Sequence, residues 1–246
     1  MIPQRQIRMM FRLATSGEGE LVDGMLGAVR RRMGTLARLL VAAGATAAVV
    51  ASAGCAPHSD YMREVETPVA QPKAPSDAAL VYFVRPSSFA YLATYEVVDV
   101  RVMPNGKPEG TGHFLGDSLA STHFAAVVPA GEHYFVAFHE SDPIARNDAM
   151  RASLAPGRVY FVEIAPNIAG VSILAITPRS DSWQHVRGWI ADTKELAPDR
   201  PGGEAYLADH PDDVRDEITH ALEHLTDDNP EELAERTITA GDGVVP

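Results

Sequence analysis

The chain has 246 residues, of which 46% are hydrophobic and 22% are charged. This composition is typical of one or two globular domains, and it excludes a fully disordered chain and a multi-pass membrane protein. The net charge is −12, and the residues after Cys55 carry 14 Lys and Arg against 30 Asp and Glu. Because an acidic surface repels phosphates and anionic lipid headgroups, we expect no nucleic acid partner and no attachment to a membrane through a basic patch.

The N-terminal region has the pattern of an export signal. Arginines at 30–32 and Arg38 precede a run, 39–55, in which every residue is apolar or small. A positive end, an apolar stretch and a small-residue cleavage site are the three parts of a secretory signal peptide. The run is shorter than the roughly 20 residues of a stable membrane-spanning helix. We therefore predict a cleaved signal peptide at 25–54, with 1–24 as an extension or a misplaced start.

The end of this signal predicts how the protein is anchored. Residues 51–55 read Ala-Ser-Ala-Gly-Cys and resemble the lipobox of bacterial lipoproteins, in which a diacylglycerol is joined to the cysteine sulfur before cleavage. Ser52 departs from the usual aliphatic residue. Ala51 and Ala53 also form the A-x-A site of ordinary signal peptidase, so plain secretion is the alternative, ahead of an uncut anchor or a structural cysteine. Cys55 is the only cysteine and can form no internal disulfide, which favours lipidation of Cys55.

The residues after Cys55 predict where the protein resides. An aspartate directly after the lipidated cysteine resembles a signal that retains a lipoprotein in the inner membrane. This chain has Ala56 at that position. We therefore expect a lipoprotein of the cell envelope, in the outer membrane and facing the periplasm or the cell surface. Its membrane partner is reached through the lipid on Cys55. The stretch 56–77 contains four prolines and few large apolar residues. We therefore predict a flexible, lipid-anchored tether over 55–77.

The folded region begins at residue 78 and shows a period of two. Short runs rich in Val, Ile, Tyr, Phe and Thr cover 80–84, 96–103, 121–128, 133–139, 150–154, 159–164 and 173–177. Arg85 before Pro86 is expected to end the first strand, and Gly106 and Gly131 to supply positive φ in hairpin turns. Since no amphipathic helix intervenes, we predict a mainly β fold over 78–178, an antiparallel β-sandwich of about seven strands, and no parallel α/β fold.

Four segments of this region also resemble a known family. They read VYFVRPSS at 81–88, NGK at 105–107, VPAGEH at 128–133 and PGRVYFV at 156–162. In this order they are similar to the landmarks of a small lipoprotein domain, the bacterial domain of unknown function 2846. The chain departs from that pattern at Ala130, where a second proline is usual, and through an insertion at 111–120. The resemblance implies an envelope location and a sandwich fold, and it implies no catalytic residues.

The C-terminal region, 179–246, is predicted to be an acidic helical tail. A short helix is expected at 183–194, and helical periods recur at 212–225 and 230–236. Residues 197–246 hold 3 Lys and Arg against 14 Asp and Glu. The tail either packs on the sandwich through the apolar side of its first long helix or stays a loose appendage. A solvated surface is favoured over a docking surface for a basic partner. The side expected to pack consists of Val214, Ile218, Ala221, Leu222 and Leu225.

Two histidine patterns are candidates for metal chemistry. His220, Glu223 and His224 match the H-x-x-E-H zinc motif, but they lie on the side of the helix opposite its apolar residues and no third ligand follows. We therefore interpret that match as accidental.

The second pattern comprises His113, His123, His133 and His139 in the predicted sandwich. A hairpin loop of Ala130 and Gly131 alone would put His123 on the face opposite the other strand histidines, whereas a loop one residue longer would place His123 across from His139. His123 and His139 are therefore the candidate metal ligands. We predict that the protein holds neither a metal nor a cofactor.

No constellation for covalent catalysis is recognisable either. Ser87 and Ser88 lack the G-x-S-x-G elbow, and there is no glycine-rich phosphate loop. The sequence therefore predicts a non-enzymatic binding or structural module that meets an envelope protein or a glycan. The alternative is an envelope metal-binding protein or hydrolase that uses the sandwich histidines.

Overall fold

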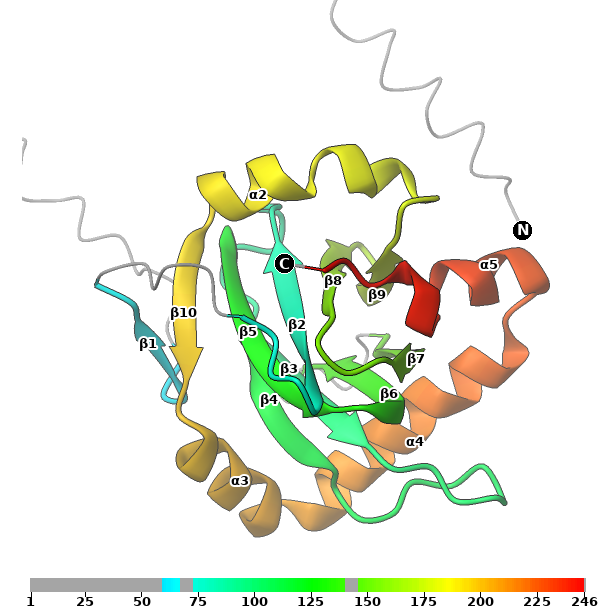
Figure 1. Cartoon of the computed structure of the whole chain (residues 1–246). Coiled ribbons are helices and arrows are strands. Elements are labelled where there is room, and N and C mark those ends of the chain that lie inside the picture. The colour runs from blue at the N-terminus through cyan, green and yellow to red at the C-terminus, as the bar shows by residue number, and fades with distance from the viewer. Residues whose placement is uncertain (1–58, 67–72, 140–145, 246) are drawn as a thin grey trace, which may run out of the picture. The chain divides into compact units, whose positions relative to one another are not determined.

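The computed structural model of the chain describes residues 59–66, 73–139 and 146–245. The predicted signal peptide and Cys55 lie outside the described residues. From residue 59 onward the described chain forms two β-sheets with helices on their outer faces (Figure 1). Among the described residues, no helix has the length and apolar character needed to cross a bilayer.

The two sheets contain six and five strands. The six-stranded sheet has the order β1 (Met62–Glu64), β10 (Lys194–Pro198), β5 (Thr122–Pro129), β2 (Ala78–Arg85), β8 (Val159–Asn167) and β9 (Gly170–Ile176). The five-stranded sheet has the order β11 (Thr237–Ile238), β7 (Asp148–Leu154), β6 (Gly131–Phe138), β3 (Tyr95–Val100) and β4 (His113–Ser118).

The inner faces of both sheets share one hydrophobic core. Phe83 of β2 stacks on Phe124 of β5 with ring centroids 5.0 Å apart, and it meets Phe135 of β6 edge-on at 5.4 Å. All three rings are buried, and each contributes about 1.5–3 kcal/mol by leaving water. The period-two pattern of the sequence therefore places alternate residues in a core between the sheets.

The structure agrees with the prediction in part: the described chain is rich in strands and has C-terminal helices, but with these helices it is a mixed α/β fold rather than a mainly β one. Two further details differ. Each of the seven predicted runs overlaps a strand, but the described chain has eleven strands. The sheets are also mixed, because β2 pairs in parallel with β8, β5 with β10 and β7 with β11. The prediction of a purely antiparallel sandwich was wrong. Where the chain passes from one sheet to the other and back, the next strand can run parallel to its neighbour.

The link between β5 and β6 is a corner between the sheets. We predicted a hairpin here, but β5 pairs with β2 and β10, whereas β6 pairs with β3 and β7. Gly131 has φ +137°, a conformation that L side chains rarely adopt, and this lets the chain pass from one sheet into the other. Neither hairpin register considered for the histidines therefore exists.

Four strands were not indicated by the sequence. β4 lies in the segment interpreted as an insertion, and β10 and β11 lie in the predicted tail. β1 lies within the predicted tether, where Met62 pairs with Pro198 of β10. The segments before and after the predicted sandwich therefore supply strands to both sheets.

Two helices of the tail pack on the outer face of the five-stranded sheet. The last three helices are α3 (Arg200–Asp209), α4 (Pro211–Asp227) and α5 (Pro230–Glu235), and Figure 1 shows α3 and α4 lying along this sheet. The predicted apolar side of α4 is buried against side chains of β3, β6 and β7. α3 approaches so closely that a Cβ added at Gly203 would meet the ring of Phe114 at 2.1 Å. The structure thus favours the packed alternative over a loose appendage.

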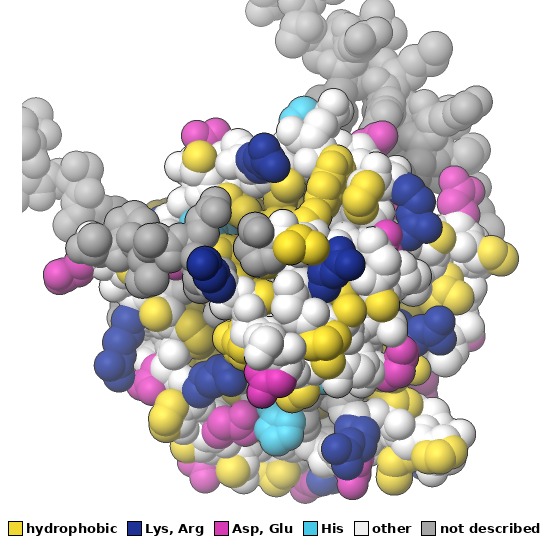
Figure 2. All heavy atoms as spheres, viewed as in Figure 1, with side chains coloured by type: hydrophobic (Ala, Val, Ile, Leu, Met, Phe, Trp, Pro, Cys, Tyr) yellow, Lys and Arg dark blue, Asp and Glu magenta, His cyan; other side chains and the backbone are white. Residues whose placement is uncertain are grey.

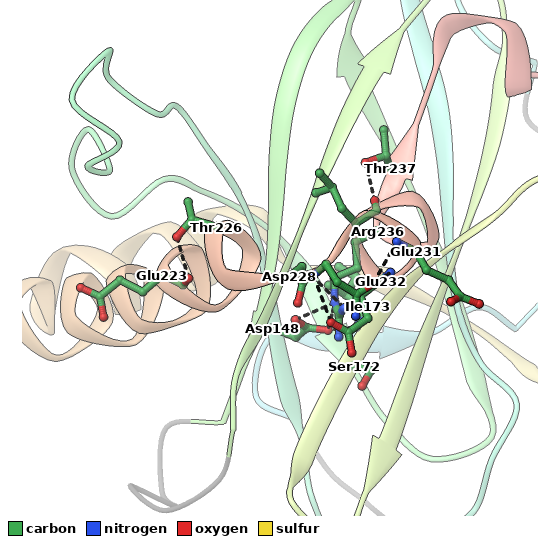
Figure 3. A network of polar contacts seen from close by, with 12 residues as sticks. Asp148, Ser172, Ile173, Glu223, Thr226, Asp228, Glu231, Glu232, Arg236 and Thr237 are labelled. Atoms are coloured by element: carbon green, nitrogen blue, oxygen red, sulfur yellow. Dashed lines mark hydrogen bonds and ion pairs between the residues drawn. The ribbon is translucent and has the colours of Figure 1, made fainter. Parts of the chain in front are cut away.

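A buried ion-pair network fastens the end of the tail. The Arg236 guanidinium donates to both oxygens of Asp148 at 3.0 and 2.9 Å and to Asp228 at 2.9 Å (Figure 3). The Asp148 carboxylate also accepts from the backbone N–H of Ile173 at 3.0 Å. The three charged side chains are at most 10% exposed. The network therefore joins α5 to strands of both sheets.

Candidate functional site

An aromatic cleft lies on the outer face of the six-stranded sheet. The 3-10 helix η1 (Asp181–Gln184) and the short helix α2 (Val186–Asp192) cross this face, and Val244 near the C-terminus pairs with Val159. Between them is a cavity of about 750 Å³. Figure 2 shows hydrophobic side chains gathered on this face between α2 and the C-terminal segment. Its lining includes Tyr82, Phe161, Trp183, Ile190 and Val244.

The aromatic rings of the cleft are positioned by strand pairing. Tyr82 of β2 is the direct partner of Phe161 of β8, and their rings stack with centroids 5.6 Å apart. Trp183 of η1 stands edge-on to Phe161 at 6.1 Å. These contacts hold the rings of one apolar wall in place before a ligand arrives. Ordering these side chains therefore adds little entropy cost to binding.

Few polar groups line this cleft. Gln184 and Arg187 contribute hydrogen-bond donors to its lining. Burial and the nearby Glu195 raise the pKa of the Tyr82 hydroxyl, so this group keeps its proton at neutral pH. A mostly apolar wall with a few donors is typical of pockets that bind small molecules.

A second, polar cleft surrounds His133 at the corner between the sheets. Its cavity of about 790 Å³ is lined by His113, His133, Asp99, Arg200 and Glu204, among others. Nδ1 of His133 lies 2.9 Å from Asp99, and Nε2 lies 2.9 Å from the carbonyl oxygen of Pro129. Both ring nitrogens are therefore engaged.

The charge state of His133 follows from these contacts. Burial lowers the pKa of its imidazole, but the hydrogen bond and charge of Asp99, with the carbonyl of Pro129, outweigh burial and raise it. An imidazolium that donates from both nitrogens has no lone pair for a metal ion or for a general base. The imidazole of His133 is thus held between Asp99 and Pro129.

The other sandwich histidines lie apart from this pair. His113 shares the polar cleft, where it lies 3.6 Å from Glu204, and its side chain is exposed. His123 lies in the six-stranded sheet, with Nδ1 2.9 Å from the Thr193 hydroxyl, and burial lowers its pKa. His139 follows β6 of the other sheet and meets Tyr95 edge-on at 5.7 Å. The two metal candidates from the sequence, His123 and His139, are thus not brought together.

The remaining motif residues have ordinary surroundings. His220 and His224 lie on the exposed side of α4, as predicted. Ser87 accepts a hydrogen bond from the backbone N–H of Phe89 within a loop. In the part of the chain that the structure describes, no three His, Cys, Asp or Glu side chains are grouped so that they could hold a metal ion.

The sequence contains a signal that indicates the aromatic cleft. The runs 81–84 and 159–162 are apolar at every position, whereas a strand with one solvated face alternates. Continuous apolar strands indicate that both faces are covered or line a site. Locating the cleft also required the parallel pairing of β2 with β8, which no local pattern gives.

Comparisons with protein-family models, with curated proteins and with solved structures gave no significant match. The resemblance to the domain of unknown function 2846 therefore stays a prediction from the sequence.

Proposed function

We propose that this chain is a lipid-anchored protein of the cell envelope whose folded domain is a non-enzymatic binding module for a glycan. The observation that carries the binding role is the wall formed by Tyr82, Phe161 and Trp183 in a cavity of about 750 Å³. The anchor rests on the signal peptide pattern and on Cys55, and an outer-membrane location rests on Ala56.

The chemistry of the aromatic cleft favours a glycan over other occupants. Sugar rings present apolar C–H faces, which complement aromatic side chains, and hydroxyl edges, which need donors such as Gln184 and Arg187. A basic protein partner would need carboxylates, but the side chains named for this cleft are mostly apolar. The engaged ring nitrogens of His133 give the hydrolase alternative no support.

The anchor is tested in cells. We expect the protein to incorporate labelled fatty acid and to sediment with outer membranes, and Cys55→Ser to abolish the labelling and release the protein. Unlabelled wild-type protein that begins at Gly54 would show plain secretion instead.

The binding site is tested by tryptophan fluorescence, because the chain has two tryptophans. Trp189→Phe leaves Trp183 of the cleft as the sole reporter, and soluble glycan strands released from peptidoglycan should change its emission in a saturable manner. The matched variant Trp183→Phe leaves Trp189, which stacks on His185 at 5.9 Å, and its emission should not respond. Saturable binding of fatty acid without glycan binding, or no binding of either, would contradict the proposal.

A further inference from the structure

The loop between β2 and β3 exposes three large apolar side chains. In this segment, residues 86–94, Phe89 is 50% exposed, Tyr91 46% and Leu92 74%. We name it the apolar loop. Single exposed apolar residues are common on proteins, but three within four positions form a patch of the kind that marks an interaction site.

The side chain of Arg85 holds the apolar loop in place from inside the domain. This side chain is fully buried, and its guanidinium donates to the carbonyl oxygens of Phe89 at 3.0 Å, Ala90 at 2.7 Å and Ala93 at 2.7 Å. It also lies over the ring of Tyr95, 5.0 Å from its centroid. The loop is therefore preorganised, and its apolar side chains point outward while its carbonyls point inward.

The hydrogen bonding of the loop suits a medium of low polarity. A segment that enters the interface of a bilayer must satisfy its backbone groups internally, because each unsatisfied group is costly there. In the apolar loop, three carbonyls accept from Arg85, the N–H of Ala93 donates to Ala90 at 2.9 Å, and the N–H of Phe89 donates to Ser87 at 3.0 Å. Five backbone groups of the loop, on Phe89, Ala90 and Ala93, are therefore paired within the protein.

The apolar loop also lies close to the point where the N-terminal segment joins the domain. Arg85 donates to the carbonyl of Ser118 at 3.0 Å, and the preceding residue, Asp117, accepts a hydrogen bond from the hydroxyl of Ser59. Cys55 precedes Ser59 by four residues, so its Cα lies at most about 14 Å from that of Ser59. The free length between a lipid on Cys55 and the domain is therefore short.

A fourth exposed apolar side chain lies at the same end of the sheet. β2 and β8 run parallel, with Val84 paired to Glu163, so the loops that follow these strands emerge from one edge of the sheet. The turn after β8 carries Ile168, which is 97% exposed. Ile168 thus adds an exposed apolar side chain at this end of the sheet.

We propose that the apolar loop inserts into the interface of the bilayer that holds the lipid on Cys55, and that its partner is a lipid surface of zwitterionic headgroups. The inference rests on the proposed lipid anchor. The acidic domain disfavours anionic headgroups, so the contact is apolar, with Phe89, Tyr91 and Leu92 as its anchors. Insertion would fix the orientation of the domain relative to the membrane, which a long flexible tether alone would not do.

The test places a fluorophore on the loop of the full-length lipidated protein. A lipid thioether blocks the single native thiol, so an environment-sensitive dye reacts only with the cysteine of Leu92→Cys. In vesicles of phosphatidylethanolamine and phosphatidylcholine, we expect a blue shift and a several-fold rise in emission. The matched control is Met103→Cys, because Met103 is 38% exposed and follows β3 at its opposite end. Its dye should keep the emission of a probe in water.

The outcomes separate the inference from the anchor on which it rests. If mass spectrometry shows the lipid and the dye at position 92 behaves like the control, the insertion is overturned while the anchor stands. If mass spectrometry shows no lipid and Cys55 takes a second dye, the anchor fails, and the insertion that rests on it is overturned together with it. A dye that stays water-like on vesicles but is shielded in cells would identify a protein partner and overturn the proposal.

Discussion

The outer faces of the two sheets are covered in different ways. On the five-stranded sheet, α4 has 17 residues, spans about 26 Å and buries its apolar side along the strands. On the six-stranded sheet, α2 has 7 residues and spans about 10 Å, so that a cavity remains beside it. One helix closes its face, and the other leaves the aromatic cleft open.

This difference teaches that composition alone does not distinguish a structural segment from a surface one. The acidic tail is highly charged, yet α4 completes a core with its apolar side while most of its carboxylates face water. The cleft, by contrast, is built from residues that looked like ordinary strand core. Function is therefore sought on the incompletely covered face.

The largest effect is expected where the tail is fastened to the sheets. Arg236→Met removes the guanidinium that neutralises Asp148 and Asp228. The two buried carboxylates then lose this positive partner. Breaking a buried ion pair from one side costs about 3–5 kcal/mol. The free energy of unfolding from urea denaturation should fall by that amount.

The matched control for that change is Arg215→Met on α4. Arg215 pairs with Asp212 on the surface, with the side chains 48% and 92% exposed, so its loss should change stability by less than about 0.5 kcal/mol. Similar losses for the two variants would mean that the network does not fasten the tail.

A smaller effect is expected from the covered face itself. Ile218 is fully buried between α4 and the five-stranded sheet, and Ile218→Ala should lower the free energy of unfolding by about 2–4 kcal/mol through lost burial and a cavity. His220→Ala, on the exposed side of the same helix, should be neutral within about 0.5 kcal/mol. Equal tolerance at both positions, measured by thermal denaturation, would mean that the helix does not close this face.

The parts of the fold that sequence reasoning found are those with a regular period. The side of α4 that packs was predicted residue by residue, because its apolar positions follow the helical repeat. The strand ending at Arg85 and the positive φ of Gly106, +79°, were also predicted. Local chemistry determines each of these features, so a single sequence suffices.

The parts that were missed depend on contacts between distant segments. β4 contains Gly116 and Asp117, which are poor strand formers, and it is a strand because β3 pairs with it. Gly131 indicated a turn, but no local signal told whether the chain would form a hairpin or cross to the other sheet. The burial of Arg85 was hidden for the same reason, since a charged residue before a proline reads as a surface strand end.

An intermediate effect is expected where the N-terminal segment meets β4. Burial raises the pKa of the Asp117 carboxyl to about 6 from 3.8, although the Ser59 hydroxyl donates to it and lowers the pKa, and Asp60 adds to the rise. The native state therefore binds this proton more tightly than the unfolded state does. The free energy of unfolding should fall as the pH rises from about 4 to 6, by about 2 kcal/mol for this group, since one pKa unit corresponds to about 1.4 kcal/mol.

Asp117→Asn isolates this contribution. The amide cannot ionise, so the variant should lack this fall and gain stability relative to the wild type as the pH rises to 7. Denaturation curves at pH 4, 5, 6 and 7 measure the difference. A difference that stays constant over this range would show that Asp117 ionises normally and that the N-terminal segment does not bury it.

The smallest effect is expected at His133, which lies on neither outer face. Asp99 and Pro129 raise the pKa of its imidazole above 6.5 despite the opposing effect of burial. A raised pKa means that the charged form stabilises the fold fully below pH 6.5, and that this stability is lost as the pH rises through the native pKa.

His133→Gln keeps a donor for Asp99 but cannot take the charge. We expect the variant to be less stable than the wild type by under about 1 kcal/mol at pH 5.5, with the gap closing above neutral pH. An NMR titration of the His133 ring gives the independent check, and a midpoint below 6.5 would refute the ion pair. A normal midpoint would also return the polar cleft to the list of sites with a free imidazole, and with it the hydrolase alternative.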